Sequence, residues 1–294
     1  MAVNNREIII EIGPFSEWQG ALANALTGVR IVSNGSLGTF KADVRCQKNM
    51  IEFPNDAVIR IWNLKPSTRQ QFKKAGLFVR VYAGYEGGSH EMIFSGSLMQ
   101  TTHKRVGPDI VTTLTCMTGG SALQMSTFSK TYAQGVPVIQ IVAEMAAALP
   151  GVIVDPTQIK VSGTIGYKGF SYNGSTMNGL SKLANQFGFS WSIDNGVFVA
   201  VEDMAARRST SILLNRNSGL IEVSPRMFGI NQAQEGVDIS CLYTQGIEAG
   251  HTIRVESDVD SSLTDSYICH TIEYDLSPKE SNWNMQIYSF KPKV

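Results

Sequence analysis

The stretch from residue 57 to residue 119 constrains the fold most, because clear signals for strands, turns and one short helix follow each other closely there. A β-branched and aromatic run at its start predicts a strand. Pro66 presets a helical φ and begins a short helix, which ends at Gly76. Two hairpins follow, with a glycine-rich turn over residues 84–88 and a polar loop over residues 104–109.

The composition indicates a folded, turn-rich β protein with no strong charge. Of 294 residues, 43% are hydrophobic and 17% are charged, which is typical of globular proteins. The 25 basic residues balance the 25 acidic ones, so the chain lacks the basic excess that gripping a phosphate backbone requires. No signal peptide and no apolar run of about 20 residues is visible. We therefore expect synthesis in a cytoplasm and no membrane partner.

Two β-rich units flank a different middle unit. Strand patterns fill residues 1–120 and 206–294, whereas residues 121–205 combine two amphipathic helices with short strands. The middle unit ends in a hairpin, because Asn195 and Gly196 separate two alternating apolar runs, which is a strong hairpin signal. The predicted fold class is α+β and mainly β.

Weaker signals leave several segments open. Residues 15–27 fit either a loop or a short helix, and residues 120–135 have little periodicity and are interpreted as a linker. Residues 160–174 are interpreted as irregular or β. Gly96 follows an apolar strand pattern, where a bulge or a close backbone approach is expected.

Short motifs occur in a fixed order in the first β unit. They are Ile59-Arg60-Ile61-Trp62-Asn63-Leu64, Ala83-Gly84-Tyr85 and Ile93-Phe94-Ser95-Gly96, followed by the run from Asp109 to Leu114 that leads to Gly119. Their order and spacing resemble the first tube-like domain of phage baseplate hub proteins. These hubs are trimeric proteins at the end of a tail tube, related to the base of type VI secretion spike proteins.

The second β unit carries further motifs of the same kind. Gly219 and Leu220 lie in a segment that resembles the start of the family's second tube domain. Gly250 lies in a glycine-centred strand motif, and the last strand begins at Trp283, as in the family's closing pattern. The middle unit resembles the family's small central domain by type and position only. The resemblance implies two tube-like β-barrel domains flanking a small α+β domain.

The resemblance also implies a structural role in the virion. Such a hub forms a homotrimeric ring of pseudo-sixfold symmetry, because each chain supplies two wall segments. The ring joins the hexameric tail tube protein to the trimeric central spike protein, and the tape measure protein and other baseplate proteins are further expected partners. DNA passes through the channel only in transit. The expected location is the tail baseplate, assembled in the host cytoplasm.

No catalytic motif accompanies these patterns. None of the four histidines lies three or four residues from another, and neither a GxSxG nor a P-loop occurs. Asp155 and Asp194 are interpreted as turn residues rather than as a glycosidase pair. Cys46, Cys116 and Cys269 lie in strand-like runs and are interpreted as small buried apolar residues, with disulfides or a metal site as alternatives. We therefore expect no enzyme activity, no cofactor and no metal.

Aromatic residues of the middle unit support a second hypothesis, in which the protein is a β-rich cell-wall or carbohydrate-binding tail module. Aromatic faces stack well on sugars, and packing in the core is the alternative role. The residues concerned are Tyr167, Phe170, Tyr172 and Trp191.

Overall fold

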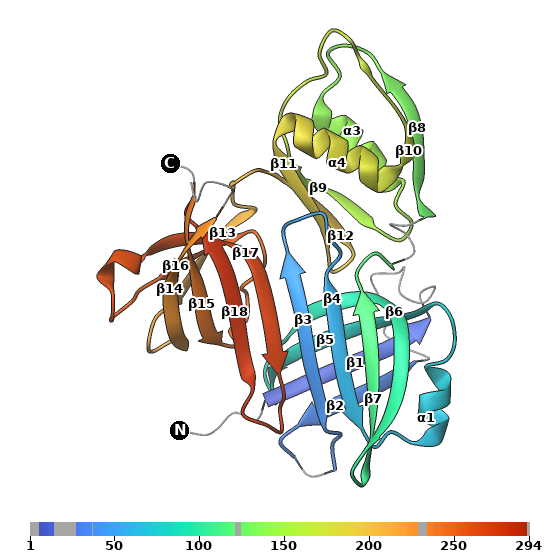
Figure 1. Ribbon diagram of the computed structural model, residues 1–294, viewed down its shortest axis with the longest axis vertical. Helices are drawn as coiled ribbons and strands as arrows, with labels where there is room; N and C mark the ends of the chain where they lie inside the picture. Colours follow the sequence, from blue (N-terminus) through green and yellow to red (C-terminus); the bar gives the residue numbers. More distant parts are fainter. Residues whose placement is uncertain (1–5, 15–27, 37, 121–124, 229–233, 293–294) are drawn as a thin grey trace.

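The computed structural model describes residues 6–14, 28–36, 38–120, 125–228 and 234–292. Residues 15–27, for which the sequence left loop and helix open, lie outside this part. The described chain is α+β and mainly β, as predicted. Figure 1 shows two β-rich parts side by side, with the helices of the middle unit beyond one end of them.

The first β unit, residues 1–120, is built from seven described strands and one short helix. They are β1 (Arg6–Pro14), β2 (Val29–Asn34), β3 (Ala42–Asn49), β4 (Asp56–Trp62), α1 (Pro66–Gln71), β5 (Leu77–Tyr85), β6 (His90–Val106) and β7 (Asp109–Met117). Two predictions were wrong here. α1 ends at Gln71, before the predicted end at Gly76. The polar loop expected over residues 104–109 is only a tight turn, because β6 and β7 stay paired up to Val106 and Asp109.

Gly96 marks a close approach of two backbones. β6 runs through it as a single strand of 17 residues. A Cβ added at Gly96 would lie 2.6 Å from the carbonyl oxygen of Met117 in β7, so a larger side chain would push the strands apart. The predicted close approach is confirmed, and the nearest bulge of β6 against β7 falls between Leu98 and Gln100 instead.

The middle unit, residues 121–205, packs two helices on small sheets. Its elements are β8 (Thr127–Tyr132), α3 (Val138–Ala147), β9 (Ile153–Lys160), β10 (Phe170–Ser175), α4 (Thr176–Phe187), β11 (Phe189–Asp194) and β12 (Val197–Glu202). The apolar stripes of α3 and α4 meet in a core of their own around Val142, Leu180 and Leu183. The linker predicted over residues 120–135 was wrong in part, because β8 lies within it and pairs with β10.

The second β unit, residues 206–294, follows without another long helix among its described residues. Its elements are β13 (Arg208–Leu214), β14 (Leu220–Phe228), β15 (Gln234–Leu242), β16 (His251–Val255), the 3-10 turn η2 (Ser261–Leu263), β17 (Asp265–Leu276) and β18 (Trp283–Phe290). Alternating burial along β18, from Trp283 to Phe290, places one face of the strand in the core.

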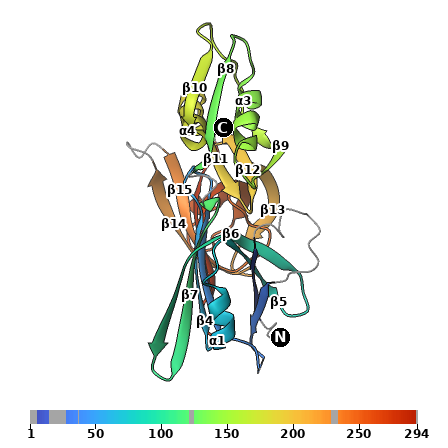
Figure 2. The ribbon, with the colours of Figure 1, turned by 90° about the vertical axis from the view of Figure 1, so that its right-hand side faces the viewer.

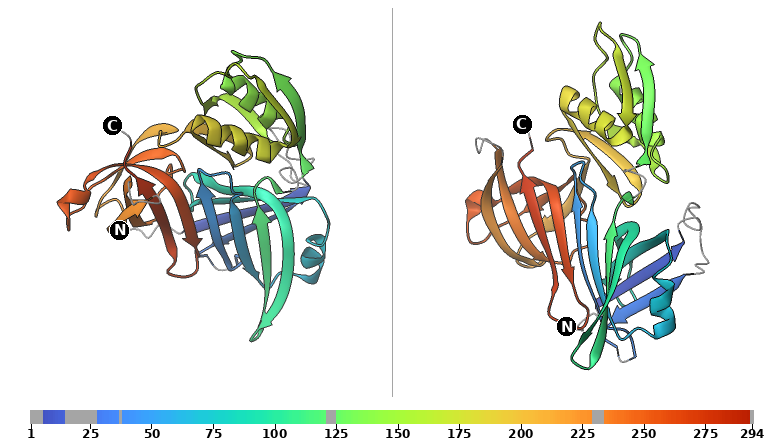
Figure 3. Two further views of the ribbon diagram at one scale, coloured as in Figure 1. Left: turned by 45° about the horizontal axis from the view of Figure 1, so that its top comes forward. Right: turned by 45° about the vertical axis from the view of Figure 1, so that its right-hand side comes forward.

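The two β units share one sheet and one core. Thirteen strands form a single sheet, in which the path runs β14-β15-β18-β17-β3-β4-β7-β6-β5-β1-β2 and β13 and β16 lie off it. Antiparallel pairing of β17 with β3, from Thr271 opposite Asn49 to Leu276 opposite Val44, joins the units. In Figure 3 the red strands accordingly lie beside the blue ones. The described strands do not close into a barrel within one chain.

The Asn195-Gly196 turn links β11 to β12 as the sequence predicts. The φ angles are 50° at Asn195 and 84° at Gly196, which is the pattern of a type I′ turn. The Gly196 carbonyl oxygen also accepts a hydrogen bond of 2.8 Å from the Ile153 amide. An added Cβ at Gly196 would meet nothing within 4 Å, so only backbone strain opposes a larger residue there.

Replacing Gly196 with valine should lower the free energy of unfolding by about 1–2 kcal/mol, since a β-branched residue is strained at positive φ. Chemical denaturation followed by circular dichroism measures the change. Gly166 is the matched control, because its surroundings are equally open and its φ is ordinary, so Gly166→Val should stay within about 0.5 kcal/mol. Equal losses in both variants would contradict the turn assignment.

Candidate functional site, a polar sheet face across both β units

The joint between the β units is built around Trp283. Its indole is 1% exposed and packs edge-on against Tyr85 and Tyr243, with ring centroids 6.1 and 5.5 Å away. The indole Nε1 donates a hydrogen bond of 3.3 Å to the Tyr85 hydroxyl. The Tyr243 hydroxyl in turn donates to the Ala83 carbonyl oxygen at 3.1 Å. Two residues singled out by the sequence, Tyr85 and Trp283, therefore meet across 198 positions of chain.

The other motif residues of the first β unit lie in its framework. Trp62, at the end of β4, lies under the Lys41 ammonium at 4.5 Å. Asn63 turns the chain with φ 57°, and its amide donates to the Asp109 carboxylate at 2.8 Å and accepts from the Ile110 amide at 2.9 Å. Two further motif residues of this unit, Leu64 and Phe94, are buried in the core.

The remaining motif glycines take part in strand pairing and backbone hydrogen bonds and do not line a cleft. Gly84 pairs with Glu7 of β1 and with His90 of β6. The Gly219 carbonyl accepts a hydrogen bond of 2.9 Å from the Leu242 amide, and the Gly250 amide donates one of 2.7 Å to the Cys269 carbonyl. Leu220, beside Gly219, packs partly buried against the shared core. Among the described residues, the hydrogen bond between Tyr85 and Trp283 is the one that joins motif residues of the two β units by their side chains.

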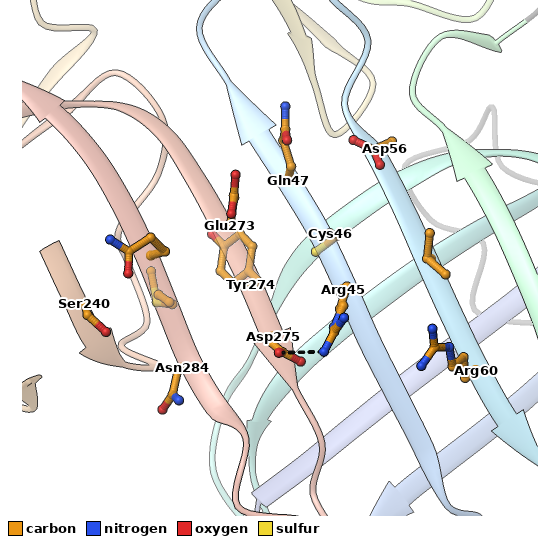
Figure 4. Close-up of a pocket in the computed structure, with 13 residues that line it drawn as sticks. Arg45, Cys46, Gln47, Asp56, Arg60, Ser240, Glu273, Tyr274, Asp275 and Asn284 are labelled. Carbon is orange, nitrogen blue, oxygen red and sulfur yellow. Dashed lines mark hydrogen bonds and ion pairs between the residues drawn. The ribbon is translucent and has the colours of Figure 1, made fainter. Parts of the chain in front are cut away.

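A polar face extends over both β units on the side of the sheet opposite the core. Cross-strand partners form continuous rows across the boundary between β17 and β3. One row contains Ser240, Gln286, Glu273 and Gln47, and the next contains Asn284, Asp275, Arg45 and Val58. Figure 4 shows members of these rows, among them Gln47, Glu273 and Asp275, on neighbouring strands. The rows line a shallow groove of about 660 Å³.

Ion pairs on and beside this face also cross the joint. The Arg45 guanidinium lies 3.2 Å from the Asp275 carboxylate, and Lys41 pairs with Glu280. The Ser277 hydroxyl donates to the Asp43 carboxylate at 2.7 Å. Burial raises the pKa of Asp43 above its usual value, and the Ser277 hydrogen bond offsets part of that shift. The face is thus polar, mixed in charge and continuous, without a convergent catalytic pair.

A buried charge node, formed by Lys48, Asp194 and Arg207, lies where all three units meet. The Lys48 ammonium is 3.5 Å from one Asp194 oxygen, and the Arg207 guanidinium is 2.9 Å from the other. The side chains of Lys48 and Asp194 are 2% and 8% exposed. The Lys48 ammonium and the Asn195 amide both donate to the Met92 carbonyl oxygen, at 3.3 and 3.1 Å. These contacts attach the β11–β12 hairpin of the middle unit to the first β unit.

Opposite charges decide the pKa values in this node. Burial by itself would raise the pKa of Asp194, but Lys48 and Arg207 bring it below its usual value. Burial would lower the pKa of Lys48, but Asp194, Glu248 and Glu91 bring it above its usual value. Both side chains are therefore charged at neutral pH.

The sequence analysis missed this node and interpreted Asp194 only as a turn residue. A signal for Lys48 does exist in the chain. Ala42, Val44 and Cys46 occupy the inward positions of β3, and Lys48 falls at the next one along the same face. A lysine on an apolar face requires a buried acidic partner, although strand spacing does not identify which one.

Most of the middle-unit aromatic residues lie in its core. Trp191 is 2% exposed and stacks on Phe198 with centroids 5.8 Å apart. Phe170 is 6% exposed and lies parallel to Tyr172, which is half-buried. Only Tyr167 of the four is widely exposed, at 79%. The arrangement therefore lacks the open aromatic platform that a sugar would need.

Neither a metal centre nor a membrane span emerges in the described residues. Cys46, Cys116, Cys241 and Cys269 are free and buried, as predicted for three of them from their strand patterns. Burial raises the pKa of Cys46 to about 12, so this thiol is unreactive. The described part of the chain holds no group of three potential metal ligands among His, Cys, Asp and Glu. No described helix is long and apolar enough to cross a membrane.

Comparison with solved structures places this fold among tail proteins. A prophage MuSo2 43 kDa tail protein from Shewanella oneidensis superposes with a TM-score of 0.64 at 10% identity, over 98% of this chain and 97% of that one. A tail protein from Neisseria meningitidis MC58 gives 0.61 at 9% identity, over 97% and 96%. The type VI secretion component c3393 of E. coli gives 0.60 at 11% identity, over 88% and 76%. These identities support a shared fold alone.

Sequence comparison gives the family directly. No curated protein sequence matches the chain. Residues 38–289, however, match the family described as Baseplate hub gp41. That range covers the polar face, the Trp283 joint and the charge node. The protein therefore belongs to the baseplate hub gp41 family and is a structural component of the phage tail baseplate.

Proposed function

We propose that three copies of this chain form a ring that joins the hexameric tail tube to the trimeric central spike. The observation that carries the proposal is the single sheet shared by the two β units. Because both units contribute to one wall, three chains supply six wall segments. Such a ring has true threefold and approximate sixfold symmetry.

The polar face gives this ring a wet inner surface. Apolar side chains on the opposite side of the sheet form the shared core, so the polar rows are the side that suits a water-filled channel. The face mixes Arg45 and Arg60 with Glu273 and Asp275. A lining of balanced charge would let DNA pass without holding it. The middle unit, attached through the charge node, would lie outside the channel.

Size-exclusion chromatography with light scattering tests the ring. The expected mass at micromolar concentration is three times 32.1 kDa. Class averages of the same sample should show a threefold ring with a central channel, and adding tube or spike protein should produce stacked complexes. A chain that stays monomeric with both partners present would exclude the hub ring. Binding to purified cell-wall glycan by such a monomer would instead support the carbohydrate-binding hypothesis.

A further inference from the structure

One corner of the first β unit concentrates positive charge, although the whole chain is neutral. This basic corner comprises α1, the turn after it and the end of β6, with the cations Lys65, Arg69, Lys73, Lys74, Lys104 and Arg105. In the described part of the chain, none of these six has an acidic side chain within ion-pair distance. The Thr101 hydroxyl donates to the Phe72 carbonyl at 3.5 Å and fixes β6 beside α1.

The same corner exposes a strand edge and an apolar side chain. β5 pairs with β6 only as far as Ser97, so the described partner of the rest of β6 is β7 alone. Val106, at the end of β6, is 53% exposed. Figure 2 shows the β6–β7 hairpin reaching out beside α1. Free edges and exposed apolar residues are typical of a surface that another chain covers.

The β14 end of the sheet has complementary features. Among the described strands, β14 pairs only with β15, and a cleft of about 550 Å³ lies beside it, between β14 and the segment that follows β16. Acidic side chains line this cleft, namely Glu222, Asp258 and Asp260, with Arg216 as the one cation. Exposed apolar residues lie next to them, with Ile221 at 57% and Val259 at 94% exposure. The Arg216–Asp258 pair, at 3.7 Å, is open to solvent and therefore weak.

We infer that the β14 cleft of one copy receives the basic corner of the next copy in the ring. The two surfaces lie on opposite sides of the molecule (Figure 1), separated along the sheet by β15, β18, β17, β3 and β4, so one chain cannot join them to each other. A head-to-tail contact between copies uses both surfaces once per subunit and closes when the rotation completes a circle. It covers both free strand edges, buries Val106 against Ile221 and Val259, and neutralises the unpaired cations. The inference rests on the proposed trimer and adds which surfaces form its contacts.

Charge-reversal variants test the contact by light scattering. Lys104→Glu with Arg105→Glu places acids opposite the acidic cleft, and Glu222→Lys with Asp258→Lys places cations opposite the basic corner. Each double variant should weaken the trimer roughly a hundredfold or more, because like charges at an interface are strongly unfavourable. The Asp260 side chain, which caps η2 through the Ser262 amide, is left intact. All four positions are exposed, so the melting temperature of the dissociated chain should change little.

The chain with all four reversals distinguishes charge pairing from general damage. Its surfaces are again complementary, so the trimer mass should return. A matched control reverses two exposed lysines of the middle unit, Lys168→Glu and Lys182→Glu, and should leave the trimer intact. If the wild type and both double variants are all trimers, this contact is overturned and the hub ring stands. If a double variant loses the trimer and the chain with all four reversals does not regain it, this contact is overturned as well. A monomeric wild type would overturn the ring itself.

Discussion

Replacing Asp194 with alanine should lower the free energy of unfolding by about 3–5 kcal/mol, because it leaves a buried ammonium without its counter-charge. Lys48 is 2% exposed, and the Asp194 carboxylate is its only ion-pair partner within 4.0 Å among the described residues. Arg207 loses its 2.9 Å contact at the same time. Urea denaturation followed by tryptophan fluorescence measures the loss.

Two controls separate the buried charge from simple truncation. The surface glutamate Glu256 also pairs with an arginine, but its side chain is 44% exposed, so Glu256→Ala should change stability by less than about 0.5 kcal/mol. Combining Asp194→Leu with Lys48→Met removes both charges and should recover much of the loss. If this double variant is less stable than Asp194→Ala, an unpaired Lys48 does not cause the loss of stability in Asp194→Ala.

The same node should make the protein sensitive to acid. The folded-state pKa of Asp194 lies below its usual value, so its stabilising contribution is complete above the unfolded-state pKa of about 4. That contribution declines as the pH falls through the folded-state pKa. The Asp194→Leu/Lys48→Met variant should therefore lose less stability than the wild type between about pH 5 and pH 2. If the free energies of unfolding of the two proteins fall in parallel across that range, Asp194 is excluded as a source of the acid response.

Replacing Trp283 with alanine should cost about 3–5 kcal/mol, since it empties a buried site of indole size. The indole packs on Tyr85 and Tyr243, so its removal creates a cavity at the joint between the β units. Trp62 is the matched control, because it is only half-buried and the Lys41 ammonium lies 4.5 Å from its ring. Trp62→Ala should cost about 1 kcal/mol. Losses of similar size at the two positions would contradict a special role for the joint.

Local sequence signals predicted most helices, strands and turns of this chain, but they did not predict which distant strands pair. Pro66 begins a helix through its own backbone preference, and Asn195-Gly196 selects its turn in the same way. The pairing of β17 with β3 depends on both strands at once, and the sequence of neither strand identifies the other as its partner. For the same reason the sequence identified Tyr85 and Trp283 as separate motif residues, while their contact and the Lys48–Asp194 pair emerged only from the structure.

The pairing of β17 with β3 also has a consequence for synthesis. Arg45 and Asp275, which pair across this boundary, are 230 positions apart. At about 5–20 residues per second, a ribosome needs roughly 10 to 50 seconds to make the intervening chain. During that time β3 is present without its β17 neighbour, and an open strand edge can capture other nascent chains. Yield in an expression host should therefore depend on chaperone supply and translation rate more than on the stability of the finished protein.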